Sequence, residues 1–287
     1  MNKKIALIND LKSYDRMAYL NSASIISAFG DRAYVDIKKD RAYDAYISSF
    51  INNCDDISKY REIIGDAKLD NPHTLFLCDP KFADNGEVNE GITDAHIQSY
   101  MKLMELSDII TPNFTEALMI VGESYDTESK KYNIIKYEND SKEKVDTLSK
   151  KIIENLFPIL DKIRFKKNQI TIITGIELYN AILTILDVYD GDHGKRQTTC
   201  NYSEKIDNRY GAGDIFNALF FETSTNGFNL VDALSATTSF INNSLRYSRD
   251  MKIDERMGIF FEPILYDNIM VMKKRLHEKN KKINKEV

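Results

Sequence analysis

The stretch DIITPNFTEALMIVG, residues 108–122, decides the fold class. Ile109 and Ile110 predict a short buried strand, and Pro112 ends it because proline has no N–H to donate to a sheet. The following residues predict a helix, with Glu116 in the first turn, where the positive end of the helix dipole favours a carboxylate. A buried strand that runs directly into a helix is the repeating unit of parallel α/β folds.

The same alternation continues in both directions from this stretch. Short apolar runs predict further buried strands at residues 4–8, 74–78, 170–174 (ending at Gly175) and 181–189. Helical spacing or an apolar helix is found at residues 17–29, 94–106, 148–165, 215–221, 230–245 and 259–276. An antiparallel excursion is expected from the turn at 190–192 to about residue 206. The pattern therefore predicts a mostly parallel sheet covered by helices on both faces, within one domain spanning residues 1–287.

Composition limits the function classes. The chain has 287 residues, with 43% hydrophobic and 29% charged residues, as in an ordinary globular protein. Its net charge of −5 lacks the basic footprint of a nucleic-acid-binding protein. Three cysteines without a CxxC pair argue against a disulfide framework and for the cytoplasm, and no apolar run is long enough for a membrane span. We expect a polar surface loop at 123–147 and a frayed basic tail at 278–287.

Polar residues gather where the predicted strands end. Examples are Asn9, Asp10, Asp79, residues 111–113, Thr174 and the loop 211–214. In parallel α/β sheets the ligand crevice lies beyond the carboxyl ends of the strands, so we expect these residues to converge there.

The turn Gly211-Ala212-Gly213-Asp214 is the most informative motif. Small residues at a helix start let backbone N–H groups approach an anion, and the adjacent Asp214 could accept a proton from a hydroxyl group. An equally weighted alternative is that Asp214 only caps the helix and the glycines only form a turn. Neither a GxxxxGK[ST] loop nor a complete GxGxxG is present, and the four histidines show no HExxH spacing.

Three segments, in order, closely resemble motifs of pyridoxal kinases, which belong to the ribokinase-like superfamily: residues 79–86 (DPKFADNG), 108–117 (DIITPNFTEA) and 211–216 (GAGDIF). Residues 8–16 and 25–30 are similar to the N-terminal motif of that family. The resemblance covers residues 4–245. It implies a three-layer α/β/α fold and a homodimer that uses ATP and Mg²⁺, with a monovalent cation as a further candidate, to phosphorylate the 5′-hydroxymethyl group of a vitamin B6 vitamer.

The resemblance also implies roles for individual residues. Asp214 would be the catalytic base, and Gly211, Ala212 and Gly213 would form the anion hole. The nucleotide-side and metal-side positions would be Asn113, Glu116, Thr174, Asp84 and Asp79, with Asp79 and Glu116 nearest the metal. The substrate-side positions would be Asn9, Asp10, Lys12 and Asp214.

The chain departs from the family pattern in three places. Lys12, Ser13 and Asp15 stand where the family has Ser, Gly and Gly, which restricts the loop beside the substrate ring. The interval 31–74 is short and polar, which predicts a reduced lid. Residues 81–83 are Lys-Phe-Ala instead of Val-Met-Gly. An alternative is therefore a paralogue that binds nucleotide or vitamer without catalysis, or a kinase of another small alcohol. The preserved 211–214 turn favours the enzyme.

Overall fold

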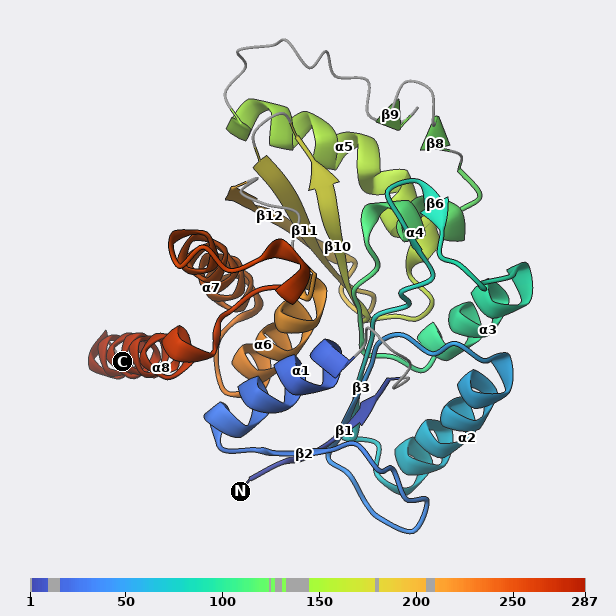
Figure 1. Cartoon of the computed structure of the whole chain (residues 1–287), viewed down its shortest axis with the longest axis horizontal. Coiled ribbons are helices and arrows are strands. Elements are labelled where there is room, and N and C mark those ends of the chain that lie inside the picture. Colours follow the sequence, from blue (N-terminus) through green and yellow to red (C-terminus); the bar gives the residue numbers. More distant parts are fainter. Residues whose placement is uncertain are drawn as a thin grey trace.

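The computed structural model describes residues 2–9, 16–123, 125–126, 131–132, 145–178, 181–204 and 210–286. Its centre is an eight-stranded sheet with the order β12-β11-β10-β7-β4-β3-β1-β2 (Figure 1). From β2 to β10 all neighbouring strands are parallel, and β10-β11-β12 form an antiparallel edge. The mostly parallel sheet and its antiparallel excursion are thus confirmed.

The strands of this sheet are β1 (Lys4–Ile8), β2 (Arg32–Tyr34), β3 (Ala45–Ser48), β4 (Leu75–Cys78), β7 (Ile109–Ile110), β10 (Ile170–Glu177), β11 (Ala181–Asp190) and β12 (Lys195–Glu204). Two small antiparallel pairs lie outside it: β5 (Ala83–Asp84) with β6 (Glu87–Val88), and β8 (Tyr125–Asp126) with β9 (Lys131–Tyr132).

Helices cover both faces of the sheet (Figure 1). One face carries α1 (Arg16–Phe29), α6 (Ala212–Thr225), α7 (Leu230–Asp250) and α8 (Glu262–Glu286), with the 3₁₀ helix η1 (Glu255–Met257) between the last two. The other carries α2 (Cys54–Asp70), α3 (Asp94–Met104), α4 (Phe114–Ile120) and α5 (Val145–Ile163). Strand β1 shows why: Ile5 and Leu7 belong to one apolar core and Ala6 and Ile8 to the other, because side chains alternate between the faces. The three-layer α/β/α prediction is confirmed.

The interval 31–74 differs from the short polar connection that we expected. It contains β2, β3 and α2. Strand β3 is buried along its whole length between β1 and β4, and α2 buries Ile57, Ile63 and Ile64 beneath an otherwise polar surface. A very short strand and a helix with few apolar residues give weak sequence signals, which is why both were missed. A reduced lid stays a prediction.

Two predicted boundaries are also wrong. Strand β10 continues past Gly175 to Glu177, because a register shift between Ile173 and Ile176 lets the strand resume after the glycine, whose φ is +72°. The basic tail expected to be frayed from residue 278 is instead helical, because α8 continues to Glu286. Lysine and glutamate are good helix formers, and cations near a helix C-terminus interact favourably with its dipole. In the described part of the chain, no helix is both long and apolar enough to cross a membrane.

Candidate active site

The predicted convergence at the carboxyl ends of the strands is present. Asn9 follows β1, Asp79 follows β4, Thr111 follows β7, and each of these residues is buried. Residues Asp10 and Lys12, predicted on the substrate side, lie outside the described residues. Asn9 is held by its backbone, which donates its N–H to the Tyr19 hydroxyl at 3.0 Å and accepts from that hydroxyl through its carbonyl. Its side-chain amide has no hydrogen-bond partner among the described residues.

The 211–214 turn begins α6, and its two glycines have different roles. Gly211 is the N-cap, with φ +94°, and a Cβ atom there would lie 2.7 Å from Nδ2 of Asn21 on α1. Glycine is therefore required at 211 by conformation and by packing. At Gly213 a Cβ atom would meet nothing within 4 Å, so open space lies beside the first turn of the helix. That space adjoins backbone N–H groups at the positive end of α6, which is the setting for binding an anion.

Asp214 lies in that first turn and is 6% exposed. Ser49, just after β3, donates its hydroxyl to Oδ1 of Asp214 at 3.1 Å, and the Lys81 ammonium pairs with the same oxygen. The alternative that Asp214 only caps the helix is wrong, because Gly211 holds the N-cap position and the contacts of Asp214 run to other elements. Asp214 is thus an oriented, ion-paired carboxylate beside an open space.

Asp79 lies next to this group. Its Oδ2 accepts a hydrogen bond from Nδ2 of Asn217 at 2.8 Å and lies 4.0 Å from Nζ of Lys81. Burial raises the pKa of Asp79 to about 7; Lys81 opposes that rise and the nearby Asp214 carboxylate adds to it. We call Asp79, Lys81 and Asp214, with Ser49 and Asn217, the Asp214 end of the site.

Asn113 and Glu116 form a reciprocal capping box at the start of α4. Oδ1 of Asn113 accepts from the Glu116 N–H at 3.0 Å, and Oε2 of Glu116 accepts from the Asn113 N–H at 2.8 Å. Asn113 also donates through Nδ2 to the Ala83 carbonyl at 2.6 Å. These contacts fix the strand-to-helix turn to the loop that carries Lys81 and Asp84. The fully buried Glu116 has a pKa raised well above its usual value by burial and by the Asp79 charge.

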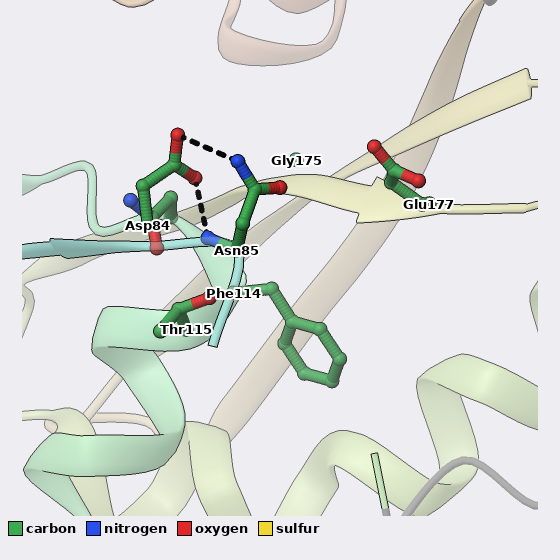
Figure 2. Close-up of a pocket in the computed structure, with 7 residues that line it drawn as sticks. Asp84, Asn85, Phe114, Thr115, Gly175 and Glu177 are labelled. Carbon is green, nitrogen blue, oxygen red and sulfur yellow. Dashed lines mark hydrogen bonds between the residues drawn. The ribbon is translucent and has the colours of Figure 1, made fainter. Parts of the chain in front are cut away.

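A small open cavity of about 60 Å³ lies beside this turn and forms the pocket end of the site. It is lined by Asp84, Asn85, Asn113, Phe114, Thr115, Gly175 and Glu177. Asn85 donates two hydrogen bonds to the Asp84 carboxylate, from its backbone N–H to Oδ1 at 2.9 Å and from Nδ2 to Oδ2 at 3.3 Å. Figure 2 shows both, with Glu177 of β10 on the opposite side of the pocket. Burial, followed by the Glu177 charge, raises the pKa of Asp84. Thr174 precedes Gly175 in this wall, and its N–H donates to the Pro112 carbonyl at 3.1 Å.

The donor set suits a hard cation that keeps part of its water. The described residues contain no ready cluster of three or more His, Cys, Asp or Glu side chains for a metal. Mg²⁺ in phosphoryl-transfer sites commonly uses only one or two carboxylates, with water and phosphate oxygens as its other ligands. Asp79 and Glu116 repel each other in a buried place, and Thr111 Oγ1 and Asn217 Oδ1 are buried without a hydrogen-bond partner in the described chain. Added positive charge and added water would relieve both features, so these residues fit Mg²⁺.

Three residues of the site were missed as functional candidates. Ser49 directly follows the overlooked strand β3, whose short apolar run Ala-Tyr-Ile was the only signal in the sequence and a weak one. Asn217 lies one turn after Asp214 on α6, a spacing that places both on one helix face. Lys81 was noticed as a departure from the family pattern, but no feature of the sequence indicates that it pairs with Asp214, which is far away along the chain.

The chain is similar in sequence to curated pyridoxal kinases over part of its length. No family model matches the chain. The chain is 30% identical over 86 residues to pyridoxal kinase PdxY of Paraburkholderia phymatum, which is 29% of each protein. It is 30% identical over 83 residues to the pyridoxal kinase of Ovis aries, which is 28% of this chain and 27% of the relative. Each match therefore spans less than a third of the curated relative.

Solved structures match over nearly the whole chain. A putative phosphomethylpyrimidine kinase from Bacteroides thetaiotaomicron, in a crystal form with pyridoxal, aligns at TM-score 0.71 and 21% identity over 93% of this chain and 96% of that one. Pyridoxal kinase from Lactobacillus plantarum aligns at TM-score 0.70 with 14% sequence identity, over 94% of this chain and 97% of that one. Pyridoxal kinase from Leishmania donovani, in complex with ADP and pyridoxamine, aligns at TM-score 0.66 with 14% sequence identity, over 94% of this chain and 96% of that one. The chain has the fold of these kinases, and the resemblance drawn from its motifs is confirmed.

Proposed function

We propose that the protein is an ATP-dependent kinase that phosphorylates the 5′-hydroxymethyl group of a vitamin B6 vitamer. The observation that carries the proposal is the oriented Asp214 carboxylate beside the open space at Gly213. A base and an anion site next to each other are what phosphoryl transfer to an alcohol requires. The similar proteins that hold pyridoxal, or ADP with pyridoxamine, give support for this substrate class.

The transfer uses Asp214 as general base. The proton of the acceptor hydroxyl moves to a carboxylate oxygen of Asp214 while the hydroxyl oxygen bonds to the γ-phosphorus. The bond from that phosphorus to the β–γ bridging oxygen breaks, and its electron pair leaves with ADP. Backbone N–H groups at Ala212 and Gly213 stabilise the charge on the transferred group. Ser49 keeps the Asp214 carboxylate aimed at the acceptor.

Asp79 and Glu116 are the residues that would hold Mg²⁺, through water or directly. When bound, the ion neutralises phosphate charge in the transfer. The chain's own contribution is to hold both carboxylates in place, Asp79 through Asn217 and Glu116 through the capping box with Asn113. Asp84 and Asn113, which line the pocket end, and Thr174, which forms a β-bridge with Asn113, are the residues that would contact the phosphates of ATP. A homodimer stays a prediction.

The test is transfer from [γ-³²P]ATP with Mg²⁺ to pyridoxal, pyridoxamine and pyridoxine, each assayed separately, with product identified as the 5′-phosphate. We expect phosphorylation of at least one vitamer, and loss of it in Asp214→Asn with MgATP binding retained. No 5′-phosphate with any vitamer, under conditions in which a known pyridoxal kinase succeeds, refutes the proposal.

A second candidate acceptor is a hydroxymethylpyrimidine. The similarity to a putative phosphomethylpyrimidine kinase favours a pyrimidine, and the replaced loop residues Lys12, Ser13 and Asp15 depart from the pattern that the resemblance implies for a vitamer. Adding this alcohol as a further acceptor to the same assay distinguishes the two, because the catalytic turn serves either hydroxyl. Binding of MgATP without transfer to any acceptor would instead support the non-catalytic paralogue.

A further inference from the structure

Lys81 lies between the two acids of the Asp214 end of the site, Asp79 and Asp214. Its ammonium pairs with Oδ1 of Asp214 and lies 4.0 Å from Oδ2 of Asp79. The lysine side chain is 28% exposed, whereas both aspartate side chains are 7% exposed. The cation therefore sits at the mouth of the site, on the solvent side of two buried acids.

The backbone is specialised to place this cation. Lys81 has a φ of +41°, in the left-handed region that a residue with a Cβ atom adopts only at a cost. Asn89 holds it there: its Nδ2 donates to the Lys81 carbonyl at 3.0 Å, and its N–H donates to the Phe82 carbonyl at 2.9 Å. The small β5–β6 hairpin anchors that loop. A lysine kept in an unfavourable conformation by dedicated contacts points to a role beyond filling space.

The charges at this end identify the role. A base must approach a phosphoryl group that is itself negative, and the carboxyl group of Asp79 lies close by, with its Oδ2 4.0 Å from Nζ of Lys81. A cation beside Asp214 reduces that repulsion, and because Ser49 and Lys81 both contact Oδ1, this contact leaves the other carboxylate oxygen, Oδ2, for the acceptor hydroxyl. An ammonium has three N–H donors on a flexible stem, so it can stay near Asp214 and still donate to a phosphoryl oxygen.

We propose that Lys81 is a built-in cation of the phosphoryl-transfer site, which contacts the γ-phosphoryl group as it passes from ATP to the acceptor. The inference rests on the proposed function. Lys81 keeps its own protons throughout, and the acceptor proton still goes to Asp214. The competing roles for Lys81 are a purely structural ion pair and a plug that blocks Asp214.

The test compares the wild-type chain with Lys81→Asn and Lys81→Arg. Asparagine removes the charge and tolerates left-handed backbone, and arginine keeps the charge. The matched control is Lys252→Asn, at an exposed lysine with a φ of +55° remote from the site in sequence and on another loop. For each variant we would measure kcat and acceptor KM with MgATP, the MgATP dissociation constant by calorimetry, the melting temperature, and the effect of added methylammonium on kcat.

We expect Lys81→Asn to lower kcat by about 10²-fold, the usual effect of removing one group that stabilises transition-state charge. The acceptor KM should change by less than about threefold, the MgATP dissociation constant should rise by about tenfold, and methylammonium should restore part of kcat. Lys81→Arg should keep at least about a tenth of kcat, and Lys252→Asn should match the wild type.

An unchanged or higher kcat in Lys81→Asn overturns the proposal and favours the plug. A loss of kcat that follows a lower melting temperature, with no recovery in methylammonium, overturns it in favour of a structural pair. If the wild type phosphorylates no acceptor, the proposed function has failed. Lys81 is then judged on MgATP affinity alone, and equal affinity in Lys81→Asn and the wild type overturns its role.

Discussion

Each end of helix α6 has a cluster of one lysine and two acidic side chains, and the two clusters differ in their surroundings. At the N-terminal end Lys81 lies between Asp214 and Asp79. At the C-terminal end Lys3 lies between two further acids, with Nζ 2.6 Å from Oδ2 of Asp31 and 3.7 Å from Oε2 of Glu222. Each group has one lysine and two acidic side chains, and in both one acid belongs to α6.

The surroundings differ in access and in the helix dipole. Asp214 lies in the first turn, where the dipole favours negative charge, next to the open space at Gly213. Glu222 is fully buried near the last turn, and Asn226 donates its Nδ2 to Oε2 of Glu222 at 2.8 Å. Burial raises the pKa of Glu222 to about 8, against the lowering effect of Lys3. Two groups of the same composition therefore differ in access to open space and in their place along the helix dipole, and only the N-terminal one suits the proposed function.

The largest expected difference between the two ends of α6 comes from removing the carboxylate charge of Asp214 at the N-terminal end. Asp214→Asn should lower turnover by about 10²- to 10⁴-fold, because the acceptor hydroxyl loses its base. MgATP affinity and melting temperature should stay near those of the wild type. Asp232→Asn is the control, since Asp232 is also the third residue after an N-cap, at the start of α7. Equal turnover in Asp214→Asn and the wild type would remove Asp214 from the mechanism.

The two glycines of the turn offer a second contrast, between function and folding. Gly213→Ala meets no atom within 4 Å, so we expect stability to be kept while kcat falls by about 10- to 100-fold as the methyl group enters the phosphoryl space. Gly211→Ala should instead lower the free energy of unfolding by about 1–3 kcal/mol, because of its φ of +94° and the clash with Asn21. Kinetics and urea unfolding of both variants check this. A Gly213→Ala chain with full activity would mean that the open space is not used.

A third change tests the proposal that Glu116, on the side of the site nearer the pocket, holds Mg²⁺. Glu116→Gln keeps the shape of the capping box but removes the carboxylate, so the Mg²⁺ concentration for half-maximal rate should rise by about tenfold. Initial rates at saturating ATP and varied free Mg²⁺ measure this. Glu62→Gln, on the exposed surface of α2, is the control and should leave the Mg²⁺ dependence unchanged. A Glu116→Gln chain with the same dependence as the control would exclude Glu116 from holding the ion.

The smallest expected effect concerns the C-terminal end of α6 and shows up as pH-dependent stability. Glu222 has a pKa near 8 in the folded chain and an ordinary value of 4.5 when exposed. Between these values the folded chain keeps a proton that the unfolded chain releases, so raising the pH from 5 to 8 lowers the free energy of unfolding. Over this interval we expect the free energy of unfolding of Glu222→Gln to fall by about 1–3 kcal/mol less than that of the wild type. Urea unfolding at several pH values measures the difference, and parallel curves for the two chains would contradict it. Catalytic turnover should be the same in both chains at pH 7.

Much of the frame could be predicted because strong local patterns encode it. The apolar runs before Asn9, Asp79 and Thr111 each form a buried strand, and the glycine turn before Asp214 starts a helix. Strand β3 and helix α2 were missed because their burial depends on neighbours rather than on a long apolar pattern. Asn113 and Glu116 were predicted on the nucleotide and metal side, and the structure shows that they form a capping box at the start of α4.

By itself the sequence determined the alternation of strands and helices, the glycine turn and the resemblance to pyridoxal kinases. These follow from residue types a few positions apart, whose steric and hydrogen-bonding preferences act locally. Only the tertiary structure brought Lys81 and Ser49 onto Asp214 and made Glu222 a buried acid at the other end of the same helix. Contacts between residues so far apart in the chain depend on sheet order and burial, because desolvation and charge pairing are set by the packed fold and not by local sequence.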